Sequence, residues 1–474
     1  MSGPPRVLVV GAGFSGALLA VRLLRLGHVR VTLIERTGAF GRGVAYGTTS
    51  DVHRLNVRAG RMSAFPDDPG HFVRWLAEHA PSEADPEGFA RRSLYGAYLG
   101  DVLRETAARA PGLLVRRFGE VATLEPERDG VTAFLSDGAF VEGEAAVLAL
   151  GAPPPATPAA VRGLLGSSRY VADPWAPHAL DLIGRSDDVV LIGTGLTAVD
   201  VLLALEARGW TGEATAVSRH GLLSEAHTGV AGAPAEAPSR LKPLSEALAE
   251  FRRRAETTPW PRLVDELRPH LQTLWLRMGH EERRRFLRHL RPWWDVRRHR
   301  LAPDVAARIA GLRAQGRLRI AGARITGASR RGDRLLIDLR PRGGGAPRTV
   351  SGAWLINCTG PADVAQAGDP LVASLLASGV ARPDPLGLGL DVDPDLRLKT
   401  ARGERHERLF AIGPLTRGVF WESTAVPELA VHAGDLARRL DGLAASWQSA
   451  GEPWRAPAGS RVLRPAGHEA PFRP

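Results

Sequence analysis

Three glycines, Gly11, Gly13 and Gly16, follow a short apolar run near the start of the chain ("VLVVGAGFSG"). This spacing is typical of a turn that binds the pyrophosphate of a dinucleotide. Gly11 permits the tight turn, Gly13 lets the ligand approach the backbone, and Gly16 lets the next helix pack on the strand. A signal peptide is the competing interpretation, but Arg22 and Arg25 interrupt the apolar residues beyond the glycines.

An acidic residue, Glu35, ends the next predicted strand ("VRVTLIER"), about 20 residues beyond the glycines, where a carboxylate can accept hydrogen bonds from ribose hydroxyls. Between the turn and that strand, "ALLAVRLLRLG" predicts a helix that ends at Gly27. The N-terminus of this helix would face the phosphates with free N–H groups. The whole unit therefore predicts a site for a dinucleotide with a free ribose.

A second, altered copy of this pattern lies in "DDVVLIGTGLTAVDVLLALEARG", residues 187–209. The strand after it, "EATAVSRHG", ends in Ser218 and Arg219 rather than in an acid. An acid repels a 2′-phosphate, whereas an arginine pairs with it, so the second site is predicted to prefer NADPH. A plain surface charge is the alternative for Arg219. The predicted NADPH-binding residues are Gly193, Thr194, Gly195, Leu196, Ser218 and Arg219.

Two dinucleotide sites in one chain indicate a flavoprotein of the α/β class with two Rossmann-like domains. FAD is expected to stay at the first site, while NADPH visits the second and reduces it. The FAD domain is predicted to be discontinuous, over residues 1–180 and 356–450, with the NADPH domain inserted at 181–355. Residues 451–474 are rich in Pro, Gly and Arg and are predicted to form a tail.

Two strand-then-glycine segments, "EAAVLALGAPPP" and "GAWLINCTGP", are predicted to be crossings between these domains. Near the end, "RLFAIG" predicts a strand that brings Gly413 to the flavin's linker. The following helix is expected to begin near residues 422–427. Its N-terminus would face the flavin pyrimidine ring, with N–H groups from Thr424 and Ala425. Packing alone is the alternative role for these residues.

A helical insertion is predicted at about 238–310, and it contains Trp260, Trp275, Trp293 and Trp294. It is either a substrate lid or a helical subdomain whose tryptophans pack in a core.

Composition excludes several other classes of function. The net charge is +11, but the basic residues are mixed with acids along the chain, which argues against a nucleic-acid partner. The single cysteine, Cys358, allows no internal disulfide and no redox dithiol, so a cytoplasmic location is expected and Cys358 is assigned to packing. No apolar stretch reaches the ~18 residues of a membrane span. No motif with metal-ligand spacing is present.

Several long motifs resemble those of a group of bacterial FAD/NAD(P)-binding oxidoreductases. They are "GRGVAYGTTSDVHRLNVRAGRMSAFPDDPGHFVRWL", "WWDVRRHRLAP", "LINCTGP" and "GPLTRGVFWESTAVPEL". More remotely, the chain is similar to flavin-containing monooxygenases and to ornithine or lysine N-hydroxylases. That resemblance implies tightly bound FAD, hydride from NADPH, and a flavin C4a-hydroperoxide that transfers oxygen to an amine or a sulfide. The partners would be a small-molecule substrate and molecular oxygen.

The resemblance also assigns roles to individual residues. Arg42 and Tyr46 would follow the FAD ribose segment. Asn56 would lie near the flavin and nicotinamide as a hydrogen-bond donor, and it is the one catalytic candidate; an asparagine that caps a turn is the alternative. The residues predicted to bind FAD are Gly11, Gly13, Phe14, Ser15, Gly16, Glu35, Arg36, Arg42, Tyr46, Asn56, Val121, Gly151, Gly413, Thr424 and Ala425.

The segment "VRRHRLAP" is absent from ordinary flavin-containing monooxygenases. Its Arg298 and Arg300 are candidates to clamp a substrate carboxylate, and interdomain ion pairs are the alternative. Three functions stay open at this stage: a monooxygenase, an NAD(P)H:acceptor reductase or oxidase without oxygen transfer, and a flavin-binding regulator that is not an enzyme.

Overall fold

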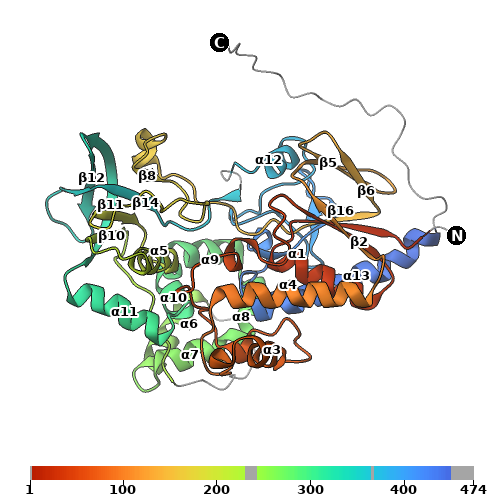
Figure 1. Ribbon diagram of the computed structural model, residues 1–474, viewed down its shortest axis with the longest axis horizontal. Coiled ribbons are helices and arrows are strands. Elements are labelled where there is room, and N and C mark those ends of the chain that lie inside the picture. Colours follow the sequence, from red (N-terminus) through yellow and green to blue (C-terminus); the bar gives the residue numbers. More distant parts are fainter. Residues whose placement is uncertain (1–2, 230–242, 365–367, 450–474) are drawn as a thin grey trace, which may run out of the picture.

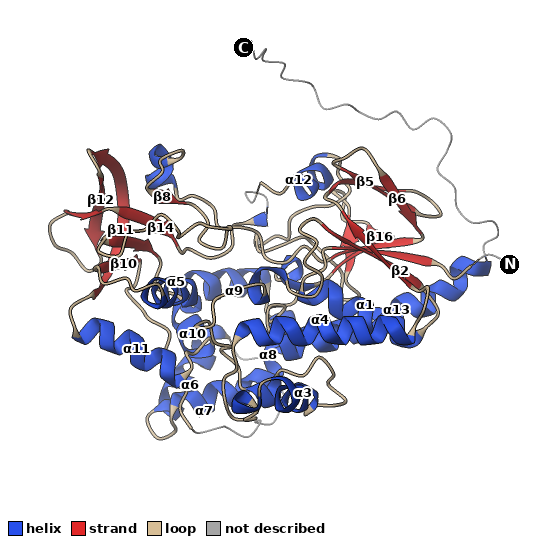
Figure 2. Ribbon diagram, viewed as in Figure 1, coloured by secondary structure: helices blue, strands red, loops and turns tan. Residues whose placement is uncertain are grey.

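The α/β class predicted from the sequence is confirmed by the computed structural model, which describes residues 3–229, 243–364 and 368–449 (Figure 1). Two main sheets lie toward opposite ends of the long axis, and helices fill the space between and below them (Figures 1 and 2). The predicted tail, 451–474, and the start of the predicted insertion, 238–242, lie outside the described residues.

The first sheet has six strands, and its central strands are parallel, as expected of strands that alternate with helices. In sheet order they are β15 (Arg397–Lys399), β16 (Arg405–Ala411), β7 (Ala145–Leu148), β1 (Arg6–Val10), β2 (Arg30–Glu35) and β3 (Leu114–Phe118). β1 lies between β7 and β2, so the strand that leads into the first glycine turn is buried on both faces. The core around the first sheet combines side chains from residues 7–149 with others from residues 364–444.

The second sheet has seven strands and carries a core on each face. In sheet order they are β13 (Arg348–Gly352), β12 (Arg334–Pro341), β11 (Leu318–Arg331), β10 (Ala214–Ser218), β9 (Val189–Ile192), β14 (Trp354–Asn357) and β8 (Tyr170–Val171). β14 pairs in parallel with β9, which leads into the second glycine turn. The predicted boundary at 355/356 thus falls inside a strand of this sheet, and β8 joins the sheet from before the predicted boundary at 180/181.

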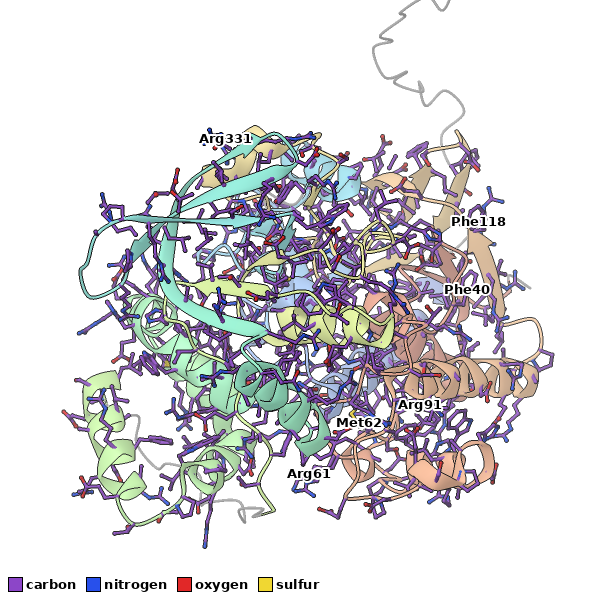
Figure 3. All side chains as sticks on the ribbon, turned by 60° about the vertical axis from the view of Figure 1, so that its left-hand side comes forward. Phe40, Arg61, Met62, Arg91, Phe118 and Arg331 are labelled. Atoms are coloured by element: carbon purple, nitrogen blue, oxygen red, sulfur yellow. The ribbon has the colours of Figure 1, made fainter. Side chains whose placement is uncertain are left out.

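A small antiparallel sheet lies beside the first one and consists of β4 (Val121–Pro126), β5 (Val131–Leu135) and β6 (Phe140–Gly143). Phe40 and Phe118 mark the outer end of the first sheet, whereas Arg331 lies at the tip of the β11–β12 hairpin of the second (Figure 3). The outer ends of the two main sheets therefore lie in different parts of the molecule.

Helices of the first region pack on the first sheet, and α1 lies against both α4 and α13. The helices outside the central segment are α1 (Phe14–Leu26), α2 (Gly43–Tyr46), α3 (His71–His79), α4 (Arg92–Arg109), α5 (Leu196–Ala207), α12 (Pro370–Ala377) and α13 (Val426–Ser449). α1 ends at Gly27, whose φ of 84° is the left-handed conformation that glycine adopts readily.

The segment between β10 and β11 is helical in its described part, which agrees with the expectation from its sequence. Its helices are α6 (Leu244–Ala255), α7 (Trp260–Leu267), α8 (Leu271–Arg277), α9 (His280–Arg285), α10 (Arg291–Arg298) and α11 (Pro303–Ala314). Of its tryptophans, Trp275 is buried, whereas Trp293 is 42% exposed. Figure 1 shows α6 and α7 at the bottom of the view, α9 level with α5, and α11 below the second sheet.

Candidate dinucleotide sites

The first glycine turn is packed so tightly that side chains are excluded from it. Gly11 has φ of 97°, and a Cβ there would lie 2.5 Å from the Ala149 carbonyl oxygen of the neighbouring strand end. A Cβ on Gly16 would overlap the Gly11 carbonyl oxygen. Gly13 is the N-cap of α1 and offers no side-chain acceptor, so the N–H groups of the first turn of α1 have no capping partner there. Such a helix start can bind a phosphate.

The carboxylate of Glu35 is tied to this turn. One oxygen accepts a hydrogen bond from the Ala12 N–H at 2.8 Å, and the other accepts from the N–H and hydroxyl of Thr37. These contacts fix the carboxylate at the end of β2, beside the helix start, where a ribose is expected. Arg36, the next residue, forms an exposed ion pair with Glu120.

A second close approach of backbone lies opposite the turn. A Cβ on Gly43 would lie 3.0 Å from the Gly13 Cα, and one on Gly13 would lie 3.4 Å from the Gly43 Cα. Arg42 is exposed at the start of α2, while the ring of Tyr46 packs against Phe14. Burial raises the pKa of Tyr46 to about 12, so this phenol stays neutral. A side chain at Gly43 would therefore crowd the Gly13 backbone, whereas one at Gly13 would reach only ordinary contact distance.

The end of β16 returns to the same place. Gly413 has φ of 84°, and a Cβ there would lie 2.6 Å from the Ser15 hydroxyl oxygen. The chain then leads to Thr424 and Ala425, directly before α13. The structure thus brings the late strand against the start of α1, as the sequence predicted.

Other predicted FAD residues are more dispersed. Val121 is buried at the start of β4, in the small sheet, and Gly151 follows β7 with open space around its Cα. Asn56 lies in a turn, and its carbonyl oxygen is 3.0 Å from Nε2 of His227, in the segment that follows β10. Asn56 therefore lies where the two regions meet, and its place between the cofactors stays a prediction.

The second glycine turn repeats the geometry of the first. Gly193 has φ of 118°, and a Cβ there would overlap the Cys358 carbonyl oxygen at the end of β14. Gly195 is the exposed N-cap of α5, directly before Leu196, and a Cβ on it would meet nothing. The backbone at this helix start is therefore open to a ligand.

The loops of the second site are joined by hydroxyl groups. The Thr194 hydroxyl donates to the Leu222 carbonyl and lies 2.9 Å from the Ser218 hydroxyl, which also accepts from the Gly221 N–H. Arg219 follows at the end of β10, is exposed, and makes no ion pair or hydrogen bond with the described part of the chain. Its guanidinium is free to meet a phosphate.

The two arginines proposed to clamp a substrate are already paired. Arg298 donates to Glu422 at 2.6 Å, and both side chains are less than 10% exposed. This pair joins the helical segment to the loop before α13, which is the interdomain alternative. Arg300 instead pairs with Asp265 inside the helical segment and donates to the Pro261 carbonyl. Neither guanidinium is available as a free clamp.

The structure reveals functional candidates that sequence reasoning did not single out. Arg92 donates to Asp200 at 2.6 Å, which fastens α4 to α5, and the His53 ring lies 3.1 Å from the Asp200 carbonyl oxygen. Desolvation lowers the pKa of His53. Arg417, inside the motif "GPLTRG", lies over the Trp421 ring beside the helical segment. Sequence offers no signal for these contacts between regions, because the partners are far apart in the chain.

Cys358 is buried in the core beside the second sheet, and burial strongly raises the pKa of its thiol. A protonated, enclosed thiol is a packing residue rather than a nucleophile. The described residues contain no cluster of side chains that could hold a metal ion. Among the same residues, no helix is both long and apolar enough to cross a membrane.

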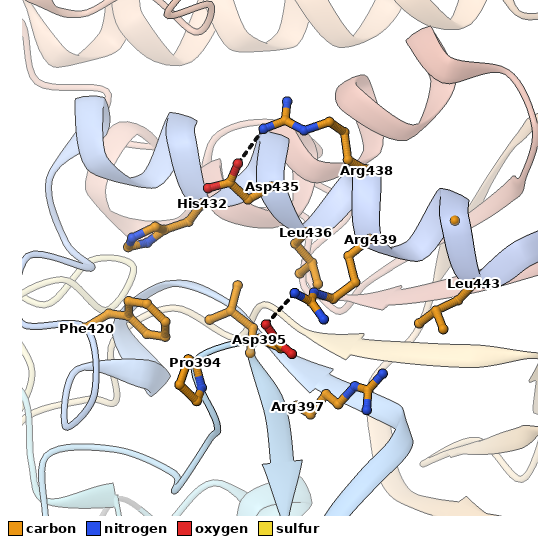
Figure 4. A pocket seen from close by; sticks show the side chains of 12 residues that line it. Pro394, Asp395, Arg397, Phe420, His432, Asp435, Leu436, Arg438, Arg439 and Leu443 are labelled. Carbon is orange, nitrogen blue, oxygen red and sulfur yellow. Dashed lines mark hydrogen bonds and ion pairs between the residues drawn. The ribbon is translucent and has the colours of Figure 1, made fainter. Parts of the chain in front are cut away.

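A separate cavity of about 660 Å³ lies between β15 and α13, away from the glycine turns. Its arginines are matched by carboxylates: Arg439 pairs with Asp395, and Arg438 pairs with Asp435 (Figure 4). The cavity therefore does not repeat the open, helix-start chemistry of the two turns.

Comparison with known proteins agrees with this geometry. Residues 8–153 match the sequence model of a family described as FAD-NAD(P)-binding. No curated protein sequence matches the chain. Among solved structures, L-lysine 6-monooxygenase from Pseudomonas syringae is 17% identical, with a TM-score of 0.64 over 92% of this chain and 99% of its own.

Two further solved structures show the breadth of this fold. Ornithine N-hydroxylase from Kutzneria sp. 744 is 18% identical, with a TM-score of 0.63 over 93% of this chain and 99% of its own. Thioredoxin reductase from Lactococcus lactis is 11% identical, with a TM-score of 0.53 over 93% and 99%.

FAD fits the first site on the structure's own terms, because Gly13 and Gly43 form a cradle that a Cβ would fill and Glu35 is held beside it. Residues 8–153 thus match the FAD-NAD(P)-binding family, on a fold that the chain shares with ornithine and lysine monooxygenases.

Proposed function

We propose that this chain is an FAD-containing, NADPH-dependent monooxygenase that oxygenates a small nucleophilic metabolite, an amine or a sulfide. The observation that carries the proposal is the pairing of two glycine turns with opposite charges. Glu35 accompanies the first and Arg219 the second. A carboxylate suits a free ribose, and an exposed arginine suits a 2′-phosphate.

The roles of the chain's residues follow from this assignment. The N–H groups at the start of α1 bind the FAD pyrophosphate, and Glu35 accepts hydrogen bonds from its ribose. The N-terminus of α13, preceded by Thr424 and Ala425, places partial positive charge where reduced flavin is negative. Bound FAD supplies hydride acceptance from NADPH and activation of molecular oxygen.

At the second site, the start of α5 binds the NADPH pyrophosphate and Arg219 pairs with the 2′-phosphate. Asn56 lies at the meeting point of the two regions, with its backbone held by His227. Its side-chain amide donates a hydrogen bond to the bound nicotinamide cofactor. A fixed donor in a water-poor site stabilises developing negative charge more than a solvated one does.

The fold supports monooxygenation without deciding it. The solved structures that share the fold include an ornithine N-hydroxylase with reduced FAD, NADP⁺ and L-ornithine, and a lysine 6-monooxygenase. They also include a thioredoxin reductase. A dithiol reductase is disfavoured here because the chain has one cysteine, and Cys358 is buried.

The test is a balance of reducing equivalents. The purified, FAD-loaded protein is mixed with NADPH, oxygen and a panel of small amines and sulfides, and NADPH consumption, hydrogen peroxide and oxygenated product are all measured. One product per NADPH with one member of the panel is the expected result. Peroxide equal to NADPH with every member would establish an oxidase. FAD that NADPH cannot reduce would leave a flavin-binding regulator.

A further inference from the structure

The helical segment docks on the loop that precedes α13 through specific polar contacts. The Trp275 indole donates to the Gly418 carbonyl at 3.0 Å, and the Gln272 amide donates to the Val419 carbonyl at 3.1 Å. The rings of Trp275 and Trp421 stack with centroids 4.6 Å apart. We call this contact between residues 268–299 and residues 417–428 the docking interface.

Three arginines in the docking interface each have a carboxylate partner. The pairs are Arg268 with Glu428 at 3.2 Å, Arg298 with Glu422 at 2.6 Å, and Arg291 with Asp295 at 3.3 Å. Each of these positive charges is therefore balanced within the chain. Only one oxygen of Asp295 takes part, because its Oδ1 is buried without a donor among the described residues.

Another arginine of the interface, Arg417, has no such partner. Its guanidinium makes no hydrogen bond or ion pair with any residue of the described ranges, and its Nε is buried without an acceptor there. The guanidinium carbon lies 4.7 Å from the centre of the Trp421 ring. The side chain as a whole is partly exposed, so a ligand can reach it.

Arg417 carries its charge at neutral pH. Burial, and then the neighbouring Arg291, lower its pKa to about 10, while Asp295 and Glu422 oppose this shift. The guanidinium is therefore still protonated. A buried charge that makes no direct ion pair is unfavourable, and a planar guanidinium is suited to two parallel hydrogen bonds to an oxyanion. The cation–π contact with Trp421 satisfies neither of these requirements.

Other buried polar atoms in the docking interface also have no acceptor or donor among the described residues. They are Nε of Arg298, Nε1 of Trp294, Oε1 of Gln272, Oδ1 of Asp295 and the hydroxyl of Ser423. The Arg298 side chain is 7% exposed and Ser423 is fully buried. Because buried polar groups in folded proteins are almost always hydrogen-bonded, this concentration indicates a site for a polar ligand.

We propose that Arg417 binds an oxyanion of the enzyme's small-molecule ligand, a carboxylate or a phosphate, at the docking interface. The inference rests on the proposed function only in taking that ligand to be the substrate. It moves the anion-binding role away from Arg298 and Arg300, which the chain already neutralises. The cavity of Figure 4 shares Phe420 with this interface, but its Arg438 and Arg439 are paired.

The experiment measures anion binding to the FAD-loaded protein without turnover. Benzoate and inorganic phosphate are titrated separately, with benzyl alcohol as the neutral probe, and binding is followed by tryptophan fluorescence and by the thermal unfolding temperature. We expect one of the two anions to raise that temperature, as a ligand of the native state does. The tighter anion identifies the oxyanion. Benzyl alcohol should have no effect.

The key variant is Arg417→Gln, with Arg283→Gln as its matched control. Arg283 also lies over this aromatic pair, 5.2 Å from the Trp275 ring centre, but it is satisfied by the Met278 and Leu276 carbonyls. Arg417→Gln should weaken the binding of the anion by about tenfold or more, because a charged hydrogen-bonded pair is lost. Arg417→Lys should give an intermediate loss, and Arg283→Gln none.

Each remaining outcome is decisive. Equal anion binding in wild type, Arg417→Gln and Arg283→Gln would overturn the proposal, as would no anion effect on wild type. If Arg417→Gln instead weakens only the retention of FAD, then the flavin is the partner of Arg417 and the proposal is wrong. Reduction of bound FAD by NADPH, measured separately, reports on the proposed function and does not depend on these titrations.

Discussion

The two glycine turns have similar backbone conformations but differ in how closely the following helix packs on the turn. In both, the first glycine has positive φ and lies against a carbonyl of a neighbouring strand end, Ala149 for Gly11 and Cys358 for Gly193. At the third position the first turn has Gly16, where no Cβ fits, whereas the second turn has a buried Ala198. The first helix is therefore pressed closer to its turn than the second.

The charged residues that follow the two turns differ in how firmly the rest of the chain holds them. Glu35 is bound to its own turn through the Ala12 N–H and to Thr37, so the first site is fastened around a fixed carboxylate. Arg219 is exposed and free of hydrogen bonds and ion pairs with the described residues. A tight, prebuilt site suits a resident cofactor, and an open one suits a cofactor that exchanges. This contrast supports the proposal that FAD stays at the first site while NADPH exchanges at the second.

The largest effect is expected when the third glycine-turn residue is changed, Gly16 in the first turn and Ala198 in the second. Gly16→Ala places a Cβ inside the Gly11 carbonyl oxygen, so we expect loss of bound FAD and a destabilisation of more than about 3 kcal/mol. The reverse change at the second turn, Ala198→Gly, should cost only about 1 kcal/mol and leave FAD bound. FAD content and thermal unfolding measure both. A stable, yellow Gly16→Ala protein would contradict the tighter first turn.

The next test removes the side chain beyond the first turn. Glu35→Ala deletes the acceptor for the Ala12 and Thr37 groups and the predicted ribose contact. Its FAD affinity should fall by about 10- to 100-fold, the cost of lost hydrogen bonds to a charged group. Ser218→Ala is the matched change at the second site and should spare FAD. Equilibrium titration of the apoproteins with FAD checks this, and equal losses would erase the distinction between the sites.

Much of this architecture could be predicted from the sequence because it is local. Glycines at the spacing of Gly11, Gly13 and Gly16 between an apolar strand and an apolar helix admit few other structures, and α1 ends at Gly27 as expected. The positions of Glu35 at the end of β2 and Ser218 at the end of β10 follow from strand length alone.

The remainder depends on contacts between distant residues, which a local pattern does not encode. The predicted boundary at 355/356 falls inside the short strand β14, in which both Trp354 and Ile356 pair with β9. The sequence left Arg298 open between a substrate clamp and an interdomain ion pair, and the partner that the structure gives it, Glu422, lies 124 residues further along the chain. Arg417 stands in a recognisable motif, and only the packed structure shows that it has no partner among the described residues.

The third test compares the arginines that follow the two strands. Arg219→Ala should raise the KM for NADPH by about tenfold or more and leave that for NADH within about twofold, because only NADPH carries the 2′-phosphate. Arg36→Ala, the equivalent change after β2, removes an exposed pair with Glu120 and should alter neither value. Steady-state kinetics with both cofactors measure the effect. Equal changes for NADPH and NADH would show that Arg219 is a plain surface charge.

The smallest expected effect concerns the link between the two regions. Burial, opposed by a hydrogen bond to the Asn56 carbonyl, lowers the pKa of His227 to about 4, with Arg300 and Arg58 lowering it further and Asp265 opposing them. The unfolded chain takes up a proton below about pH 6.5, whereas the folded chain does so only near pH 4. The contribution of His227 to the free energy of unfolding is therefore fully present above pH 6.5 and is lost as the pH decreases toward 4.

For this partly exposed ring, the loss between pH 7 and pH 5 should be on the order of 1 kcal/mol after screening by solvent. His227→Gln cannot titrate, so its unfolding free energy should depend less steeply on pH by that amount. The exposed His178 provides the control, and His178→Gln should follow the wild-type curve. Denaturant unfolding at pH 5, 6 and 7 measures the slopes. Parallel curves for wild type and His227→Gln would mean that the contact between Asn56 and His227 tolerates the proton, and that the two regions are not coupled through this histidine.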